Sequence, residues 1–381
     1  MIKESKILSK YKTIALVANS TWNIHNFRLN LLDKFISEGH EVIVIAPVDQ
    51  YIEYKEKYPG VKHYALRSLD RDSTNPIKDL ILIAELTRKY KRLKPDLVIH
   101  FTNKPNIFGA VAAKRAGVDS IAIVTGLGYA FIHNGFIKSI TTALYRYTSK
   151  YHKKFIFENI EDRELFEQEN IITRKQGISV KGCGVNTTYF HPFPSEDYNE
   201  NIVFTFVGRL LYDKGVKEFV DAAKLIKLRH PKTQFWLVGE LDPDNPATVE
   251  KDELIEWVDS DIVYYHGFQR DVRPFISKSD CVVLPSYREA IPRTITEAMA
   301  MAKPVITTDT AGCREAVEVG VNGYLAKLRD AKDLAQSMQK IMSLTPQERK
   351  IMGQSGRDIV MRQFDDRLIA QQIYDIISNL D

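Results

Sequence analysis

The sequence lacks long apolar runs and is poor in cysteine. Its longest apolar stretches, such as residues 81–84, are far shorter than the roughly 20 residues that a membrane-spanning helix needs. The three cysteines, Cys183, Cys281 and Cys313, form neither a C-x-x-C pair nor a cluster with histidine, so neither a disulfide framework nor a zinc site is expected. The polar residues 1–12 do not resemble a secretory signal peptide. We therefore expect a cytoplasmic protein in a reducing compartment.

Charge is unevenly distributed along the chain. Residues 1–190 contain 29 Lys and Arg against 19 Asp and Glu, which gives +10, whereas the remaining residues contain 24 against 30, which gives −6. A basic half is typical of a protein with an anionic partner, either a membrane surface or a nucleic acid. An ordinary solvated surface would account for the same charges.

Strand-like apolar runs alternate with amphipathic helical stretches in the first half of the chain, which is typical of βαβ units in a doubly wound parallel sheet. The predicted strands cover residues 13–18, 41–46, 97–101, 120–124 and 155–157. The predicted helices cover residues 27–37, 76–91, 107–116 and 136–150.

Prolines and polar residues interrupt this pattern over residues 189–197, which we interpret as a hinge. The alternation then resumes with strands at 202–207, 234–238, 262–265, 280–284 and 304–307, and residues 330–381 are helical in pattern. We predict an α/β protein with two Rossmann-like doubly wound parallel-sheet domains that face across a cleft. The N-terminal domain spans residues 1–190, the C-terminal domain spans 191–363, and a last helix at about 364–381 packs back on the N-terminal domain.

The segment 204–215 places two cations around a turn at the end of a predicted strand. Ligands of α/β folds bind at the carboxyl ends of strands, and Gly208 lets the backbone approach such a ligand closely. Arg209 offers a planar fork suited to phosphate oxygens, and Lys214 adds a compact positive charge. The pattern predicts a diphosphate-binding turn, although two surface cations beside a glycine turn would give the same residues.

A second segment, residues 285–297, follows a predicted strand and leads into a helix. Pro292 suits the first helical turn, and a helix start offers N–H groups and a positive dipole end to phosphates. Glu289 lies in the loop and Glu297 in the helix, about 12 Å apart at most if every step between them were helical. The two carboxylates could bind the hydroxyls of a sugar and of a ribose, but the bare pattern also fits a solvated helix face.

These motifs, in this order, resemble glycosyltransferase family 4, whose members have the GT-B fold. The resemblance rests on Gly208-Arg209 with Lys214, on Glu289 and Glu297, on residues 312–317 and on residues 320–323. Residues 182–186 also resemble that family's approach to the interdomain linker, where an Asp more often stands at Asn186.

The resemblance implies retaining transfer of a sugar from a nucleotide diphosphate donor, best matched by a UDP-sugar, with no metal or other cofactor. It implies that Arg209 and Lys214 contact the donor diphosphate. Glu289 would contact the transferred sugar and Glu297 the ribose hydroxyls. The predicted catalytic residues are Glu289, Arg209 and Lys214, and the predicted donor-binding residues are Gly208, Arg209, Lys214, Phe268, Glu289, Ala290, Ile291, Arg293, Thr294 and Glu297.

Asp242-Pro243-Asp244 is a D-x-D sequence of the kind that binds a metal in other glycosyltransferases. It follows the predicted strand 234–238 in a proline-rich segment, where Asp and Pro are ordinary turn residues. We interpret the segment as a turn and expect no metal site.

The N-terminal half departs from the family's commonest pattern, because the loop expected after the first strand, residues 19–28, lacks the usual glycine pair. It resembles instead a subgroup that includes an N-acetylgalactosaminyltransferase acting on undecaprenyl-diphosphate-linked diacetylbacillosamine. A polyprenyl-diphosphate-linked sugar is therefore the implied acceptor. Family members often carry a His within the segment that corresponds to residues 125–128, so its role here would be performed differently or would fall to His25 or His100. The predicted acceptor-binding residues are His25, Asn26, Arg28, Arg71, Lys104 and Gly126, of which Arg28, Arg71 and Lys104 would contact the diphosphate.

A lipid-linked acceptor would explain the basic half of the chain. The stretch 131–154 interleaves cations with aromatic rings, a pattern that suits a membrane surface with anionic headgroups. The cations are Lys138, Arg146, Lys150, Lys153 and Lys154, and the rings are Phe131, Phe136, Tyr145, Tyr147 and Tyr151. An ordinary helix that covers its own sheet would also explain those rings.

The sequence thus predicts a transferase that works at the inner face of the cytoplasmic membrane as a peripheral protein. Its predicted partners are a UDP-sugar, a polyprenyl-diphosphate-linked sugar and the membrane surface. A sugar-nucleotide epimerase is an alternative on the same twin-Rossmann architecture, and it would need no acceptor. A non-enzymatic nucleic-acid-binding protein is a second alternative, but the sequence contains no recognisable nucleic-acid motif.

Overall fold

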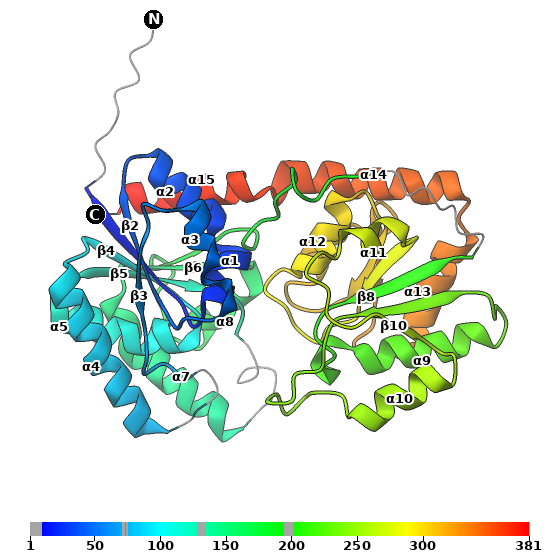
Figure 1. Cartoon of the computed structure of the whole chain (residues 1–381), viewed down its shortest axis with the longest axis horizontal. Coiled ribbons are helices and arrows are strands. Elements are labelled where there is room, and N and C mark those ends of the chain that lie inside the picture. The colour runs from blue at the N-terminus through cyan, green and yellow to red at the C-terminus, as the bar shows by residue number, and fades with distance from the viewer. Residues whose placement is uncertain (1–9, 71–72, 74, 128–134, 194–200, 381) are drawn as a thin grey trace, which may run out of the picture. The chain divides into compact units, whose positions relative to one another are not determined.

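The structure is a computed structural model that describes residues 10–70, 73, 75–127, 135–193 and 201–380 (Figure 1). The chain forms two compact units. Unit 1 comprises Met1–Cys183 with Arg367–Asp381, and unit 2 comprises Gly184–Asp366. The sequence pattern had set the limit between the domains at residue 190, whereas the division in the structure follows Cys183.

Unit 1 is built on a seven-stranded sheet of order β3-β2-β1-β4-β5-β6-β7, in which each strand pair is parallel. The strands are β1 (Thr13–Val17), β2 (Glu41–Ala46), β3 (Lys62–Ala65), β4 (Leu97–Phe101), β5 (Asp119–Val124), β6 (Lys154–Phe157) and β7 (Gly177–Ser179). Its helices are α1 (Thr21–Phe27), α2 (Leu29–Ser37), α3 (Tyr54–Lys57), α4 (Pro76–Leu93), α5 (Ala110–Ala116), α7 (Phe136–Thr148), α8 (Ile160–Gln168) and α15 (Asp366–Ser378), with the short turns η1 (Gln50–Glu53), η2 (Pro105–Gly109) and η3 (Ser149–Tyr151).

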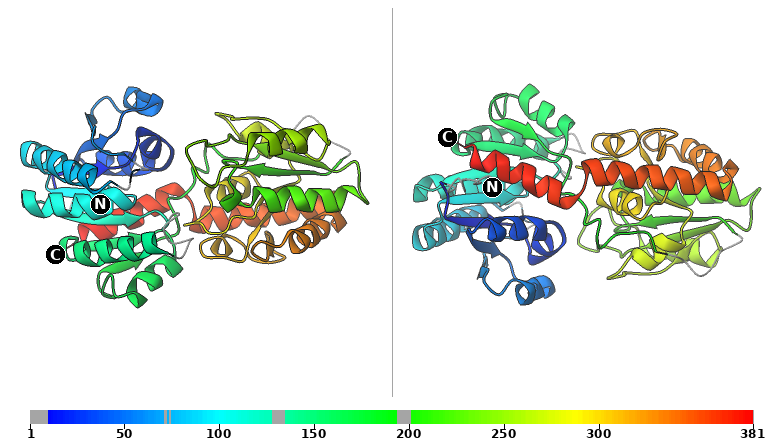
Figure 2. Two further views of the ribbon diagram at one scale, coloured as in Figure 1. Left: turned by 90° about the horizontal axis from the view of Figure 1, so that it is seen from below. Right: turned by 90° about the horizontal axis from the view of Figure 1, so that it is seen from above.

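The central strands of the unit 1 sheet, β1, β2, β4, β5 and β6, are buried on both faces, which is why they read as nearly continuous apolar runs. Successive strand residues point to opposite faces. Leu97 and Ile99 of β4 therefore join one apolar cluster with α2 and α15, while Val98 joins another with α4 and α5. Helix α15, red in Figure 2, contributes Ile369 and Ile373 to the first cluster, so the end of the chain completes the core of unit 1.

Unit 2 is built on a six-stranded sheet of order β10-β9-β8-β11-β12-β13, also parallel throughout. The strands are β8 (Val203–Val207), β9 (Gln234–Val238), β10 (Tyr264–Tyr265), β11 (Cys281–Leu284), β12 (Val305–Thr308) and β13 (Gly323–Ala326). Its helices are α9 (Val216–Lys227), α10 (Lys251–Asp259), α11 (Arg273–Lys278), α12 (Arg293–Ala300), α13 (Ala331–Ser343) and α14 (Pro346–Gln363), with the short turns η4 (Tyr212–Lys214) and η5 (Arg314–Ala316).

The predicted fold class, α/β with two Rossmann-like doubly wound parallel sheets, is confirmed. The expected loop after the first strand is wrong, because residues 21–27 form α1. The Ser20 side chain caps that helix by accepting from the backbone N–H of Asn23 at 3.1 Å. Within the described residues, no helix is both long enough and apolar enough to span a bilayer.

Candidate active site

The predicted donor residues lie beyond the carboxyl ends of the unit 2 strands. Arg209 follows β8, Phe268 follows β10, and Glu289 follows β11. Because all strand pairs of this sheet are parallel, their carboxyl ends lie at the same edge, which is the edge where α/β folds bind ligands.

Backbone contact between β8 and β9 shapes the turn that carries Arg209. The N–H of Gly208 donates to the carbonyl of Val238 at 2.9 Å. A Cβ on Gly239 would lie 1.9 Å from the carbonyl oxygen of Gly208, so the two segments touch without room for a side chain. Gly208 has a φ of +155°, and a Cβ there would meet no protein atom closer than 3.7 Å. A Cβ at that position would therefore make only ordinary van der Waals contacts, and the positive φ is what favours glycine there.

Arg209 forms an ion pair with Asp242. Its Nη1 donates to the carboxylate Oδ2 at 2.5 Å, and the arginine side chain remains 44% exposed. Asp242 is the first residue of the D-x-D sequence, and its carboxylate pairs with the Arg209 cation. Among the residues with a described structure, no group of three or more His, Cys, Asp or Glu side chains could hold a metal ion.

Lys214 and Glu289 also form an ion pair, between Nζ and Oε1. Lys214 ends η4 and Glu289 lies 75 residues later in the loop after β11, so tertiary structure alone brings these two predicted catalytic residues together. Both side chains are largely but not fully buried, at 26% and 15% exposed. They remain accessible to a ligand that arrives at the sheet edge.

Two glycines clasp the loop that carries Glu289. Gly215 has a φ of +75°, and a Cβ there would lie 2.0 Å from the carbonyl oxygen of Pro285. Gly312 has a φ of +73°, and its Cβ would lie 2.2 Å from the carbonyl oxygen of Glu289 itself. Only glycine permits this backbone conformation and this close approach together. The loop is therefore held between two backbones.

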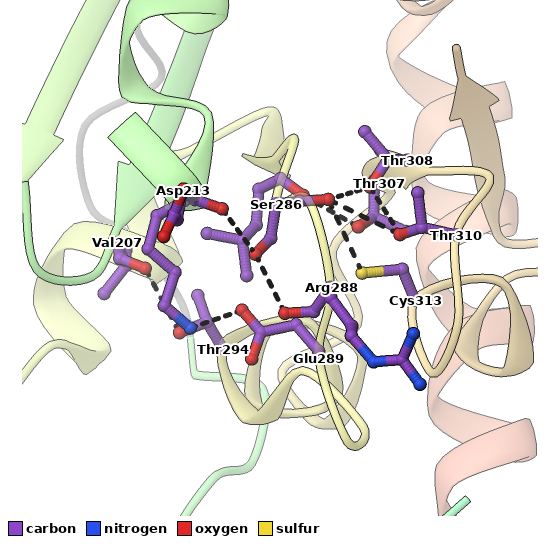
Figure 3. Close-up of polar contacts among 12 residues, drawn as sticks. Val207, Asp213, Ser286, Arg288, Glu289, Thr294, Thr307, Thr308, Thr310 and Cys313 are labelled. Carbon is purple, nitrogen blue, oxygen red and sulfur yellow. Dashed lines mark hydrogen bonds and ion pairs between the residues drawn. The ribbon is translucent and has the colours of Figure 1, made fainter. Parts of the chain in front are cut away.

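A buried set of hydrogen bonds centres on Ser286, as Figure 3 shows. On one side, the Ser286 hydroxyl donates to the carbonyl of Asp213 at 3.2 Å. On the other side, the Ser286 carbonyl accepts from the hydroxyls of Thr308 and Thr310. This network ties the Glu289 loop to the Lys214 turn and to the end of β12. In Figure 3 the side chains of Glu289 and Arg288 extend in opposite directions, with Glu289 toward the Asp213 side.

Helix α12 begins at Arg293, with Pro292 as its N-cap rather than in the first turn as predicted. The Thr294 hydroxyl donates to the carbonyl of Val207 at 3.2 Å, which fixes the positive end of this helix beside the end of β8. Arg293 Nε donates to Glu297 Oε1 at 2.8 Å. Burial raises the pKa of Glu297, and the charge and hydrogen bond of Arg293 counteract that rise.

The site therefore contains three cation and carboxylate pairs at one edge of one sheet. Six of the predicted donor residues lie in or beside these pairs. Of the other four, Ala290 is buried, Ile291 and Thr294 are half-buried, and Phe268, which follows the edge strand β10, is exposed. Each of the three cations is already paired with a carboxylate. An anionic ligand at this edge would therefore have to displace those carboxylates or bind beside them.

Sequence reasoning missed several residues that build this site. Asp242 was interpreted only as a turn residue, and its pairing with Arg209 depends on a tertiary contact between segments 33 residues apart. The roles of Ser286 and Thr308 depend on a contact of the same kind. Gly215 and Gly312 carried a visible signal, since Gly215 directly follows Lys214 and Gly312 is the first residue of the segment 312–317 on which the family resemblance rests.

The predicted acceptor residues lie in unit 1, after the carboxyl ends of strands. His25 lies in α1, with its ring 5.3 Å from that of Tyr51. Asn26, in the same helix, donates from Nδ2 to the carbonyl of Trp22 at 3.0 Å. Gly126 follows β5 with a φ of +97°. Arg71 lies outside the described residues.

Two of the predicted acceptor cations are already paired. Arg28 is buried, and its Nη1 lies 2.9 Å from Oε1 of Glu158, while its guanidinium lies 4.6 Å from the ring centre of Phe101. That burial argues against direct contact between Arg28 and a bulky acceptor. Lys104 pairs with Asp79 at 2.9 Å and is less deeply buried, so its ammonium remains within reach of solvent.

His100, the alternative to His25, is a core residue. It is fully buried, and its Nε2 lies 2.9 Å from the hydroxyl of Tyr90. Burial holds its pKa well below the ordinary value, with the neighbouring His152 adding to the effect. A neutral, enclosed imidazole packed between helices is in no position to bind an acceptor.

Two family models match the chain. A model of glycosyl transferases group 1 matches residues 201–343, and a model described as glycosyl transferase 4-like matches residues 13–159. The two matches cover the central parts of unit 2 and unit 1 respectively.

Characterised proteins with similar sequences include two lipid-linked sugar transferases. The N,N'-diacetylbacillosaminyl-diphospho-undecaprenol alpha-1,3-N-acetylgalactosaminyltransferase of Campylobacter jejuni is 29% identical, over 96% of this chain and 100% of its own length. The UDP-Gal:alpha-D-GlcNAc-diphosphoundecaprenol alpha-1,3-galactosyltransferase of Escherichia coli is 28% identical, over 70% of this chain and 71% of its own. Among solved structures, Anabaena Alr3699/HepE in complex with UDP and glucose superposes with a TM-score of 0.80 at 20% identity, over 97% of this chain and 100% of its own.

The clasped loop predicts the effect of adding a methyl group to Gly215. Gly215→Ala adds a residue that tolerates φ of +75° poorly, at a cost of about 1–2 kcal/mol, and it also displaces Pro285. We expect turnover to fall on the order of a hundredfold, because the displacement misplaces Glu289. The matched control is Gly320→Ala, which has a φ of +79° and no atom within 4 Å. Unfolding free energy and steady-state turnover should separate the two variants: equal turnover in both would contradict the assigned role of the clasp.

Proposed function

We propose that this chain, which belongs to glycosyltransferase family 4, transfers a hexose or N-acetylhexosamine from a UDP-sugar to a polyprenyl-diphosphate-linked saccharide in bacterial glycan or polysaccharide assembly. Two relatives support this acceptor, since both are named for undecaprenyl-diphosphate-linked sugars. The name of the second relative also includes a UDP-sugar.

The observation that carries the proposal is the convergence of Arg209, Lys214 and the start of α12 at one sheet edge. A nucleoside diphosphate presents charge to all three. The guanidinium and the ammonium bind its oxygens, and the positive helix end adds to their field. These groups stabilise the departing UDP, a task that Mg²⁺ performs in many other enzymes, and the reaction is therefore proposed to be independent of a metal.

Glu289 and Glu297 bind the two sugar rings of the donor. Glu289, beside Lys214, accepts hydrogen bonds from the transferred sugar. Glu297, buried and paired with Arg293, accepts from the ribose hydroxyls. Burial raises the Glu297 pKa, and Arg293 counteracts this rise because its positive charge favours the carboxylate form that accepts hydrogen bonds.

Transfer proceeds with retention through a front-face displacement. The bond between the anomeric carbon and the β-phosphate oxygen breaks, and its electron pair passes to UDP. The acceptor hydroxyl oxygen forms the new bond on the same face, and its proton passes to the leaving phosphate oxygen. Arg209 and Lys214 neutralise the charge that develops on that phosphate.

The acceptor binds to unit 1 at the carboxyl edge of its sheet. His25 and Asn26 of α1, Lys104 after β4 and Gly126 after β5 are the proposed contacts, with Arg71 as a further candidate outside the described residues. Lys104 supplies charge for the lipid diphosphate. Arg28 contributes indirectly, since its pair with Glu158 fixes the segment between α1 and α2.

The protein is proposed to act as a peripheral protein at the inner face of the cytoplasmic membrane. Helix α7 exposes Ile137, Ile140 and Tyr147, and Lys150 lies 4.6 Å from the ring centre of Tyr147. Helix α4 exposes Ile77 and Leu80 in its first turns. Both helices pack against η2. Exposed apolar side chains with neighbouring cations suit the interface of an anionic membrane.

A donor screen tests the reaction. UDP-glucose, UDP-galactose and their N-acetylated forms are each incubated with the protein, with and without a short polyprenyl-diphosphate sugar. We expect UDP release from one donor that depends on the acceptor and persists in EDTA, and about a hundredfold loss in Glu289→Gln. Conversion of the donor without release of UDP would support the epimerase instead, and a loss of turnover in EDTA would refute metal independence.

A vesicle assay tests the membrane interface. The paired variant Ile77→Ser/Leu80→Ser should bind vesicles of phosphatidylglycerol and phosphatidylcholine at least about tenfold more weakly, because two apolar side chains no longer enter the interface. The control pair Leu225→Ser/Leu228→Ser removes exposed apolar side chains from unit 2. The proposal fails if both pairs bind equally well, or if binding ignores lipid charge and salt.

A further inference from the structure

Asp242 occupies a place on Arg209 that an anionic ligand would take. Its Oδ2 lies 2.5 Å from the Nη1 of Arg209, and its side chain is 17% exposed. In the proposed donor site, Glu289 and Glu297 each have a ligand group of their own. Asp242 has none, so its pairing with Arg209 needs a separate explanation.

The segment that carries Asp242 is rigidly attached to the segment that carries Arg209. Leu210 N–H donates to the carbonyl of Glu240 at 2.8 Å, Tyr212 N–H donates to that of Ala247 at 2.7 Å, and an isolated antiparallel bridge joins Leu211 to Thr248. These backbone contacts lie on both sides of Asp242. The distance between the two charged residues is thereby set by the fold.

The hydrogen bonds of the turn use main-chain groups of Asp242, whereas its carboxylate pairs with Arg209. The turn closes through main-chain groups of Asp242, since its N–H donates to the Thr248 hydroxyl at 3.1 Å and its carbonyl accepts from the N–H of Asn245 at 2.8 Å. The carboxylate itself bonds with the guanidinium. A side chain that only made a turn would not need this placement.

We propose that Asp242 is a reversible partner of Arg209, which holds the guanidinium while the site is empty and competes with the diphosphate of the nucleotide for it. The proposal rests on the proposed function, because it takes Arg209 as a diphosphate ligand. A bound diphosphate uses the planar fork of the guanidinium for its own oxygens. It also brings negative charge next to the carboxylate, and like charges at this separation repel.

The competition has opposite consequences for the two halves of the reaction. Before transfer, Asp242 keeps Arg209 oriented at the sheet edge but weakens the binding of the donor. After transfer, it returns to Arg209 and speeds the departure of UDP. Product release limits turnover in many enzymes. Asp242 is thus a positioning residue that weakens the binding of the donor and speeds the release of UDP.

The test compares Asp242→Asn with Asp244→Asn. Both variants remove one negative charge from the same turn, and Asp244 is exposed, so the second variant controls for the long-range loss of charge. We expect Asp242→Asn to bind UDP about fivefold more tightly by calorimetry, which is the scale of one ion pair at a partly exposed site. The apparent KM for the donor and the inhibition constant of UDP should fall together, and kcat should fall with them. Asp244→Asn should change each quantity less than about twofold.

A third variant shows whether the effect acts through Arg209. In an Arg209→Ala background, adding Asp242→Asn should raise UDP affinity less than about twofold, because the competitor has lost its target and only the repulsion between the carboxylate and the diphosphate is relieved. Unchanged or weaker UDP binding in Asp242→Asn alone, with an unchanged melting temperature, would overturn the proposal. A lower melting temperature with weaker binding would overturn it in favour of a structural ion pair. If the wild-type protein does not bind UDP at all, the proposed function itself fails.

Discussion

The arrangement of the unit 2 site depends on the positive charge that is held at the carboxyl edge of its sheet. Arg209 follows β8 and Lys214 ends η4, so both cations lie at that edge. Such cations are tolerated because each is paired with a carboxylate, Arg209 with Asp242 and Lys214 with Glu289. The pairs lower the electrostatic cost of holding two cations at one edge of the sheet.

The rest of unit 2 supplies the rigidity that this arrangement needs. The Glu289 loop is clasped between Gly215 and Gly312, and the Ser286 network joins it to the turn of Lys214. Backbone contacts of this kind leave little freedom for the charged side chains to drift. A site that is already in place stabilises the charge of a leaving group without reorganisation at the moment of reaction.

Much of this design could be predicted from the sequence, because the strands and the motifs that follow them are local features. The parallel sheets and the edge that carries Arg209 and Glu289 follow from the alternation of apolar strands with helices. What could not be predicted depends on distant partners. The partner of Arg28 is 130 residues away and that of Arg209 is 33 away, so neither the burial of the first nor the pairing of the second leaves a local signal. Helix α1 was missed because its polar residues, with Ser20 as cap, resemble a loop.

The most direct measurement is the affinity of UDP for the wild-type protein, for Arg209→Ala, for Lys214→Ala and for the double variant, in low and high salt. The account predicts losses of about 1.5–3 kcal/mol for each single variant, as expected for a hydrogen bond to a charged group. The double variant should bind UDP too weakly to detect, and the salt dependence should fall with each cation removed. A folded double variant that binds UDP as tightly as the wild type would contradict the central claim.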